Sequence, residues 1–230
     1  MFLSLLWGGS FFFNGVAVTE LPTLTIIAAR VALAVLSLLI VLRIMGQSLP
    51  MDRRLLTVFL IMGTFNNAVP FFLIVWGQHA IGAGLAAILN ATTPLFTVVV
   101  ANLATSDEKL SPARLAGVLL GISGVAVLIG PAAIGTNGGP ILPQLAVLGA
   151  AVSYASASVF GRRIAGLGVS PLPTATGQLL ASSLILIPIA LVIDQPWTLP
   201  MPGMGAVMAV VGLAVKETVL LMPVRLAQVL

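Results

Sequence analysis

The stretch that decides the fold is residues 23–42, TLTIIAARVALAVLSLLIVL, in which Arg30 is the only charged residue. A helix that crosses the hydrocarbon core of a bilayer needs about 20 predominantly apolar residues, and this stretch supplies them. It therefore predicts a membrane-spanning helix. Arg30 lies nearly midway along it, where insertion scales assign a charge about 2.5 to 3.5 kcal/mol, so Arg30 needs water or a partner.

The rest of the chain has the composition of a membrane protein. Of its 230 residues, 59% are hydrophobic and 7% are charged, whereas soluble domains carry about 25% charged residues. The mean hydropathy is +1.17. Charged residues and clusters of Pro, Gly and Asn interrupt the apolar sequence. They delimit eight predicted spans, at residues 2–18, 23–42, 55–76, 82–103, 114–130, 142–161, 172–193 and 202–222.

Basic residues gather on one side of the predicted bundle. Seven of the ten Lys and Arg lie in or beside the loops after the second, fourth and sixth spans, and the loops after the first, third, fifth and seventh contain none. By the positive-inside rule, we expect a multi-pass protein of the cytoplasmic (inner) membrane with a cytoplasmic N-terminus. The seven residues are Arg43, Arg53, Arg54, Lys109, Arg114, Arg162 and Arg163.

Two parts of the chain align at an offset of about 148 residues. Residues 7–17 match 154–165, and residues 21–36 match 169–184, which places Arg30 opposite Gln178. A repeat of five spans inserts its second copy upside down because five is odd, as in many secondary transporters. We therefore predict a first repeat at residues 1–135 and an incomplete second repeat at residues 141–230.

Several short motifs carry a family resemblance. They are WGGSF at residues 7–11, ARVALA at 29–34, AAILNATTPLF at 86–96, DEKLS at 107–111 and LAGVLLGISGV at 115–125. In order and spacing the chain resembles the EamA-type transporters of the drug/metabolite transporter superfamily. The resemblance implies an all-α polytopic transmembrane bundle of inverted five-helix repeats, with about eight of the family's ten helices in this chain.

The chain departs from that family near its end. Val215, Lys216, Glu217 and Thr218 interrupt the eighth span where the family continues apolar. We therefore expect a truncated or frameshifted copy in which the chain from Lys216 onwards does not continue the span.

Two features of the spans favour a polar binding site. Arg30 would attract carboxylates from a cavity, or else form a structural contact with backbone carbonyls. Pro94 removes one intrahelical hydrogen bond and frees the carbonyl of Asn90 beside Thr93, which predicts either a polar pocket or a simple kink.

Further polar residues lie within other spans. Asn66 and Asn67 in the third span either face the cavity or bond neighbouring helices. Asn14 and Tyr154 occupy related positions of the two repeats. The substrate-cavity candidates are Asn14, Arg30, Asn66, Asn67, Asn90, Thr93, Pro94, Tyr154 and Gln178. A second set, Gly117, Gly121 and Gly124, has the spacing of helix-packing glycines.

The same composition excludes most chemistry. The chain has no cysteine and one histidine, His79, so disulfides, thiol catalysis and zinc sites of several His or Cys ligands are excluded. It carries no phosphate-binding loop motif and no basic cluster for nucleic acid. We expect no enzyme, cofactor or metal.

We expect a transporter that exports or exchanges a small polar metabolite, such as an amino acid, by alternating access within the lipid bilayer. It is also a possible homo-oligomer. The alternative is a non-transporting truncated membrane protein or an interaction subunit.

Overall fold

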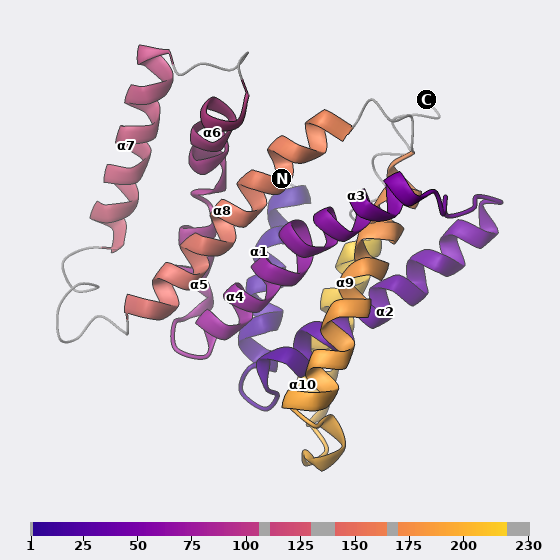
Figure 1. Ribbon diagram of the computed structural model, residues 1–230. Coiled ribbons are helices and arrows are strands. Elements are labelled where there is room, and N and C mark those ends of the chain that lie inside the picture. The colour runs from indigo at the N-terminus through magenta and orange to yellow at the C-terminus, as the bar shows by residue number, and fades with distance from the viewer. Residues whose placement is uncertain (1, 106–110, 130–140, 165–169, 220–230) are drawn as a thin grey trace. The chain divides into compact units, whose positions relative to one another are not determined.

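The structure is a computed structural model that describes residues 2–105, 111–129, 141–164 and 170–219. These residues form helices joined by turns and short loops, and no strand occurs among them (Figure 1). Five helical segments of this part are long and apolar enough to cross a membrane: Thr23–Ile44, Arg53–Gln78, Ala83–Ala104, Ile141–Arg162 and Pro171–Ile193. The predicted all-α membrane bundle is therefore confirmed.

The helices pack into two compact units, each of which takes segments from both predicted repeats. Unit 1 comprises Met1–Ala68 and Leu167–Leu230, and unit 2 comprises Val69–Gly166. The chain passes from unit 1 to unit 2 inside one helical segment, at the end of a short π-helix. These units do not coincide with the proposed repeats at residues 1–135 and 141–230, and the repeat assignment stays a prediction.

Unit 1 contains helices from both ends of the described chain. They are α1 (Phe2–Ala17), α2 (Thr23–Ile44), α3 (Arg53–Gly63), the π-helix η1 (Thr64–Ala68), α9 (Pro171–Ile193), the 3-10 turn η4 (Pro196–Thr198) and α10 (Met204–Val219). Both α9 and α10 pack against α2, while α1 packs against α10 and α3 against α9. The labelled ribbons of α2, α9 and α10 accordingly lie together in Figure 1.

Helix α2 packs deeply within unit 1. Its buried residues include Ile27, Val31 and Leu38, whose spacing of four and seven places them on one helical face. The helix ends where Gly46 adopts a left-handed φ of 63°, and its backbone N–H donates to the carbonyl of Arg43 at 3.1 Å. Glycine is favoured at this position because it has no Cβ to clash in the left-handed region.

Unit 2 is organised around one long helix. It contains α4 (Val69–Gln78), α5 (Ala83–Asn90), α6 (Thr93–Ala104), α7 (Pro112–Ile129) and α8 (Ile141–Ile164). Helix α8 packs against α4, α5 and α6, and α7 packs against α6. A Cβ on Gly77 of α4 would lie 3.0 Å from the carbonyl oxygen of Pro143, so the missing side chain lets α4 and α8 approach closely.

The predicted spans agree with the helices in position, but two of them differ in form. The third contains the π-helix η1, and the fourth is divided into α5 and α6 by a turn at Ala91 and Thr92. A break is expected there because the ring of Pro94 cannot continue a helix without losing a hydrogen bond.

The eighth span differs from the prediction in extent. We expected the chain to leave the helix at Lys216, and this is wrong for the described residues, because α10 continues to Val219. The ion pairs of Lys216 and Glu217 make that continuation compatible with an apolar surrounding.

Candidate functional site

The charge in the middle of α2 has a partner from the far end of the chain. Arg30 is 3% exposed, and its Nη2 donates to Oε1 of Glu217 on α10 at 2.6 Å. The Glu217 side chain is 14% exposed. A buried ion is tolerated when it is paired and hydrogen-bonded. Glu217 is therefore the partner that Arg30, as a charge within an apolar span, was expected to need.

Lys216 extends this ion pair into a charged cluster. Its Nζ lies 3.3 Å from the same Oε1 of Glu217, and 5.5 Å from the ring centroid of Trp7 on α1. At that distance the ring face attracts the ammonium group. We call Arg30, Lys216 and Glu217 the charged cluster. It joins α2 and α10 directly and reaches α1 through Trp7.

Sequence reasoning missed Glu217 as the partner of Arg30. It treated Lys216 and Glu217 as an interruption of the span, although a lone arginine in the middle of another span already required a partner. The signal in the sequence was the presence of opposite charges, on Arg30 and Glu217, within two otherwise apolar spans. To pair them, one would also have had to know that α10 packs against α2.

Asn14 on α1 is a further buried polar residue of unit 1. It is 2% exposed, and its Oδ1 has no hydrogen-bond partner among the described residues. Helix α1 packs against α10, the helix that carries Lys216 and Glu217. Buried polar atoms are normally hydrogen-bonded, so this acceptor is available to a bound polar molecule or water.

A polar contact also joins α9 to η1. The Nδ2 of Asn66 donates to Oε1 of Gln178 at 3.4 Å, so the structure brings these two candidates together. The neighbouring Asn67 is buried, and its Nδ2 has no hydrogen-bond partner in the described part of the chain. π-Helices are frequent at functional sites, because they displace the hydrogen-bonding pattern of the helix by one residue.

Close packing of α3 on α9 supports that contact. A Cβ on Gly63 would lie 2.6 Å from the carbonyl oxygen of Gln178. The hydroxyl of Ser182 lies 3.0 Å from the carbonyl oxygen of Gly63 and 2.7 Å from that of Gln178. The interface between α3 and α9 thus contains polar contacts, and its close approach requires glycine at position 63.

In unit 2 the predicted kink is a local hydrogen-bonded turn. The hydroxyl of Thr93 donates to the carbonyl oxygen of Asn90 at 2.7 Å, so the carbonyl that the proline frees is already satisfied. The Oδ1 of buried Asn90 has no partner among the described residues. Pro94 itself is exposed. Asn90 and Thr93 therefore remain a candidate pair, whereas Pro94 shapes the turn.

The remaining candidates of unit 2 lie on α7 and α8. Tyr154 is half-buried on α8. A Cβ on Gly121 of α7 would lie 2.7 Å from the Leu95 side chain of α6, so this glycine mediates packing. A Cβ on Gly117 or on Gly124 would meet no described atom within 4 Å. Close packing is therefore seen at Gly121, and the helix-packing role of Gly117 and Gly124 stays a prediction.

Unit 1 also contains a groove whose lining is almost entirely apolar. Its volume is about 340 Å³, and its lining comes from α2, α10 and the segment around η4. Thr25 is the one polar residue of the lining. Its backbone N–H and hydroxyl donate to Oδ2 of Asp194 at 2.7 and 2.9 Å. With so little hydrogen-bonding capacity, the groove is not suited to a small polar metabolite.

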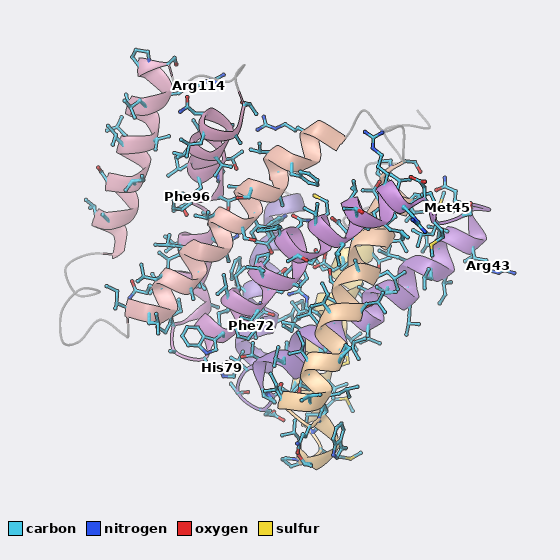
Figure 2. All side chains as sticks on the ribbon, in the orientation of Figure 1. Arg43, Met45, Phe72, His79, Phe96 and Arg114 are labelled. Carbon is cyan, nitrogen blue, oxygen red and sulfur yellow. The ribbon has the colours of Figure 1, made fainter. Side chains whose placement is uncertain are left out.

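Two arginines and the histidine lie exposed at or near helix ends. Figure 2 shows Arg43 at the end of α2, His79 beyond α4 and Arg114 near the start of α7, and all three are exposed. Arg43 and Arg114 thus lie at helix ends, in or beside the predicted loops, and the cytoplasmic side of these ends stays a prediction. The structure does not describe residues 107–110 of the DEKLS motif, which include Lys109. It also does not describe the side chain of Arg163.

Comparison with known proteins assigns this architecture to a family. The family model described as "EamA-like transporter family" matches residues 1–130. The chain is 29% identical to a protein of Escherichia coli strain K12 named an uncharacterized inner membrane transporter, YedA, over 95% of this chain and 69% of YedA. It is 22% identical to an uncharacterized transporter of Bacillus subtilis strain 168, YoaV, over 70% of this chain.

These relatives are longer than the chain. The match spans about half of YoaV, 54% of its length. A match to Protein PagO of Salmonella typhimurium strain LT2, 28% identical, covers 54% of this chain and 40% of PagO. A solved structure titled "Crystal structure of protein" has a TM-score of 0.62 at 22% identity, over 93% of this chain and 74% of that one. The structural likeness supports the fold.

Proposed function

Because the chain belongs to the EamA-like transporter family, we propose that it carries a small metabolite with a carboxylate, such as an amino acid, across the cytoplasmic membrane by alternating access. The observation that carries this proposal is the buried guanidinium of Arg30 within the charged cluster. A planar guanidinium matches the two oxygens of a carboxylate and binds them with paired hydrogen bonds.

The other polar residues of unit 1 fit the same task. Asn14 and Asn67 each hold a buried polar atom without a partner among the described residues, and Asn66 is joined to Gln178 by a long contact of 3.4 Å. Such groups orient a polar substrate by hydrogen bonds. We further propose that Asn90 and Thr93 in unit 2 contribute to the substrate path, and that the N-terminus is cytoplasmic.

The test is counterflow in proteoliposomes that contain the purified chain. The labelled solutes are an amino acid, a cation without a carboxylate and a neutral sugar. We expect exchange of the amino acid alone. Arg30→Ala should lower that exchange about 30-fold or more, because removing one partner of a buried charge pair costs at least about 2 kcal/mol.

The matched control is Arg43→Ala, which removes an exposed arginine from the end of the same helix. We expect it to exchange the amino acid as the unmodified protein does. Equal exchange by the two variants would remove Arg30 from the site. Absence of exchange for all three solutes in the unmodified chain would favour the alternative, a membrane protein that does not transport by itself.

A further inference from the structure

The apolar groove of unit 1 opens on the surface of α2 and α10. Its lining includes Leu33 of α2 and Val207 and Val211 of α10, and these three side chains are exposed. In a membrane-spanning bundle, exposed apolar side chains meet the hydrocarbon chains of the lipid, which are as apolar as leucine. A groove that faces hydrocarbon is filled by it, because empty space would cost its walls their dispersion contacts.

One end of the groove reaches the ends of the helices. Along α2 the lining extends from Thr25 to Leu33, which are eight positions, or about 12 Å of helix, apart. Both α2 and α10 begin at the Thr25 end, where the segment that joins α9 to α10 adds Pro196 and Pro202 to the lining. The hydrocarbon core of a bilayer is about 30 Å thick, so the groove has the length to hold the first part of an acyl chain, with the lipid headgroup at the helix ends.

The charges at this end of the groove are two carboxylates. Glu20 is the charged residue of residues 1–29, and Asp194 is that of residues 194–215. Each binds a residue in or beside the lining: Glu20 accepts from the backbone N–H of Gly203, and Asp194 accepts from Thr25. The N-termini of α2 and α10 each contribute about half a positive charge, so about one negative charge remains.

We propose that the groove is a lipid site that holds one acyl chain of phosphatidylethanolamine, with the primary ammonium of the headgroup at Asp194 and Glu20. Both hydrogen bonds from Thr25 fall on Oδ2 of Asp194. The Asp194 side chain makes no other hydrogen bond in the described part of the chain, so its Oδ1 can accept one from the ammonium.

The same charges disfavour a lipid with a net negative charge, such as phosphatidylglycerol. The first cation along α2, Arg30, is buried and bound to Glu217, so it does not offset the two carboxylates at the surface. The proposal concerns the lipid that surrounds the protein and does not depend on which solute the chain carries.

The test is native mass spectrometry of the chain, released from detergent micelles after titration with phosphatidylethanolamine or with phosphatidylglycerol of the same acyl chains. We expect phosphatidylethanolamine to bind about threefold more tightly or more. The double variant Glu20→Gln/Asp194→Asn should bind the two lipids equally. Each amide keeps an oxygen that accepts the same backbone hydrogen bond, so this variant changes the charge and preserves the contacts at the helix ends.

A matched pair of variants tests the groove itself, even if the double variant does not fold. Leu33→Trp fills the groove and should weaken phosphatidylethanolamine binding by about tenfold. Leu36→Trp changes another exposed leucine of α2, which is outside the lining, and should leave binding unchanged.

Three outcomes would overturn the proposal. The first is equal affinity of the unmodified protein for the two lipids, and the second is equal binding by the two tryptophan variants. The third is a dimer without bound lipid that Leu33→Trp converts to a monomer, which would assign the groove to a second copy of the chain.

Discussion

Replacing Gly63 with alanine tests the close approach of α3 and α9. The new Cβ would lie 2.6 Å from the carbonyl oxygen of Gln178, whereas ordinary contacts begin at 3.4 Å. The opposing atom belongs to the backbone, so the helices must separate by the difference, about 0.8 Å. That movement would stretch the 3.0 Å contact between Ser182 and the Gly63 carbonyl beyond hydrogen-bonding distance.

The expected cost follows from these contacts. Overpacking of this kind costs about 1 to 3 kcal/mol, and the loss of the Ser182 contact adds up to about 1 kcal/mol. Alanine in a helix recovers up to about 1 kcal/mol relative to glycine. We therefore expect Gly63→Ala to lower the free energy of unfolding by about 1 to 3 kcal/mol.

The assay is unfolding of the purified protein by sodium dodecyl sulfate in mixed micelles, followed by circular dichroism. The matched control is Gly205→Ala in α10 of the same unit, where a Cβ would meet no described atom within 4 Å. Gly205→Ala should be as stable as the unmodified protein or more stable. Equal stability of the two variants would refute the close approach at Gly63.

Two further predictions concern topology and packing. Because the chain has no cysteine, single cysteines can be labelled without background; a membrane-impermeant maleimide applied to intact cells should label Thr198→Cys and spare Ser48→Cys, and the reverse pattern would place the N-terminus outside. Gly121→Leu should lower stability by about 1 to 3 kcal/mol through a clash with Leu95, whereas Gly117→Leu should stay within about 0.5 kcal/mol. Equal losses in the same unfolding assay would contradict the assignment of Gly121 as the packing residue.

The positions of the helices follow from local properties of the sequence. Helix α2 was predicted at residues 23–42 and is observed at Thr23–Ile44, because the transfer of a segment into lipid depends on the sum over its own consecutive residues. The break near Pro94 was predicted for the same reason, since proline acts on its own helix. The hydrogen bond from the Thr93 hydroxyl to the Asn90 carbonyl was not predicted, and it satisfies the carbonyl that Pro94 frees.

The partners of the buried polar side chains depend on how the helices pack. Arg30 and Glu217 are 187 residues apart in sequence, and Asn66 and Gln178 are 112 apart. Hydropathy predicts that each of these residues lies in or near a membrane helix, but a pairing also requires that two helices be neighbours with the right faces turned together. Packing of α10 against α2 therefore turned Glu217 from an apparent interruption of a span into the counter-ion of Arg30.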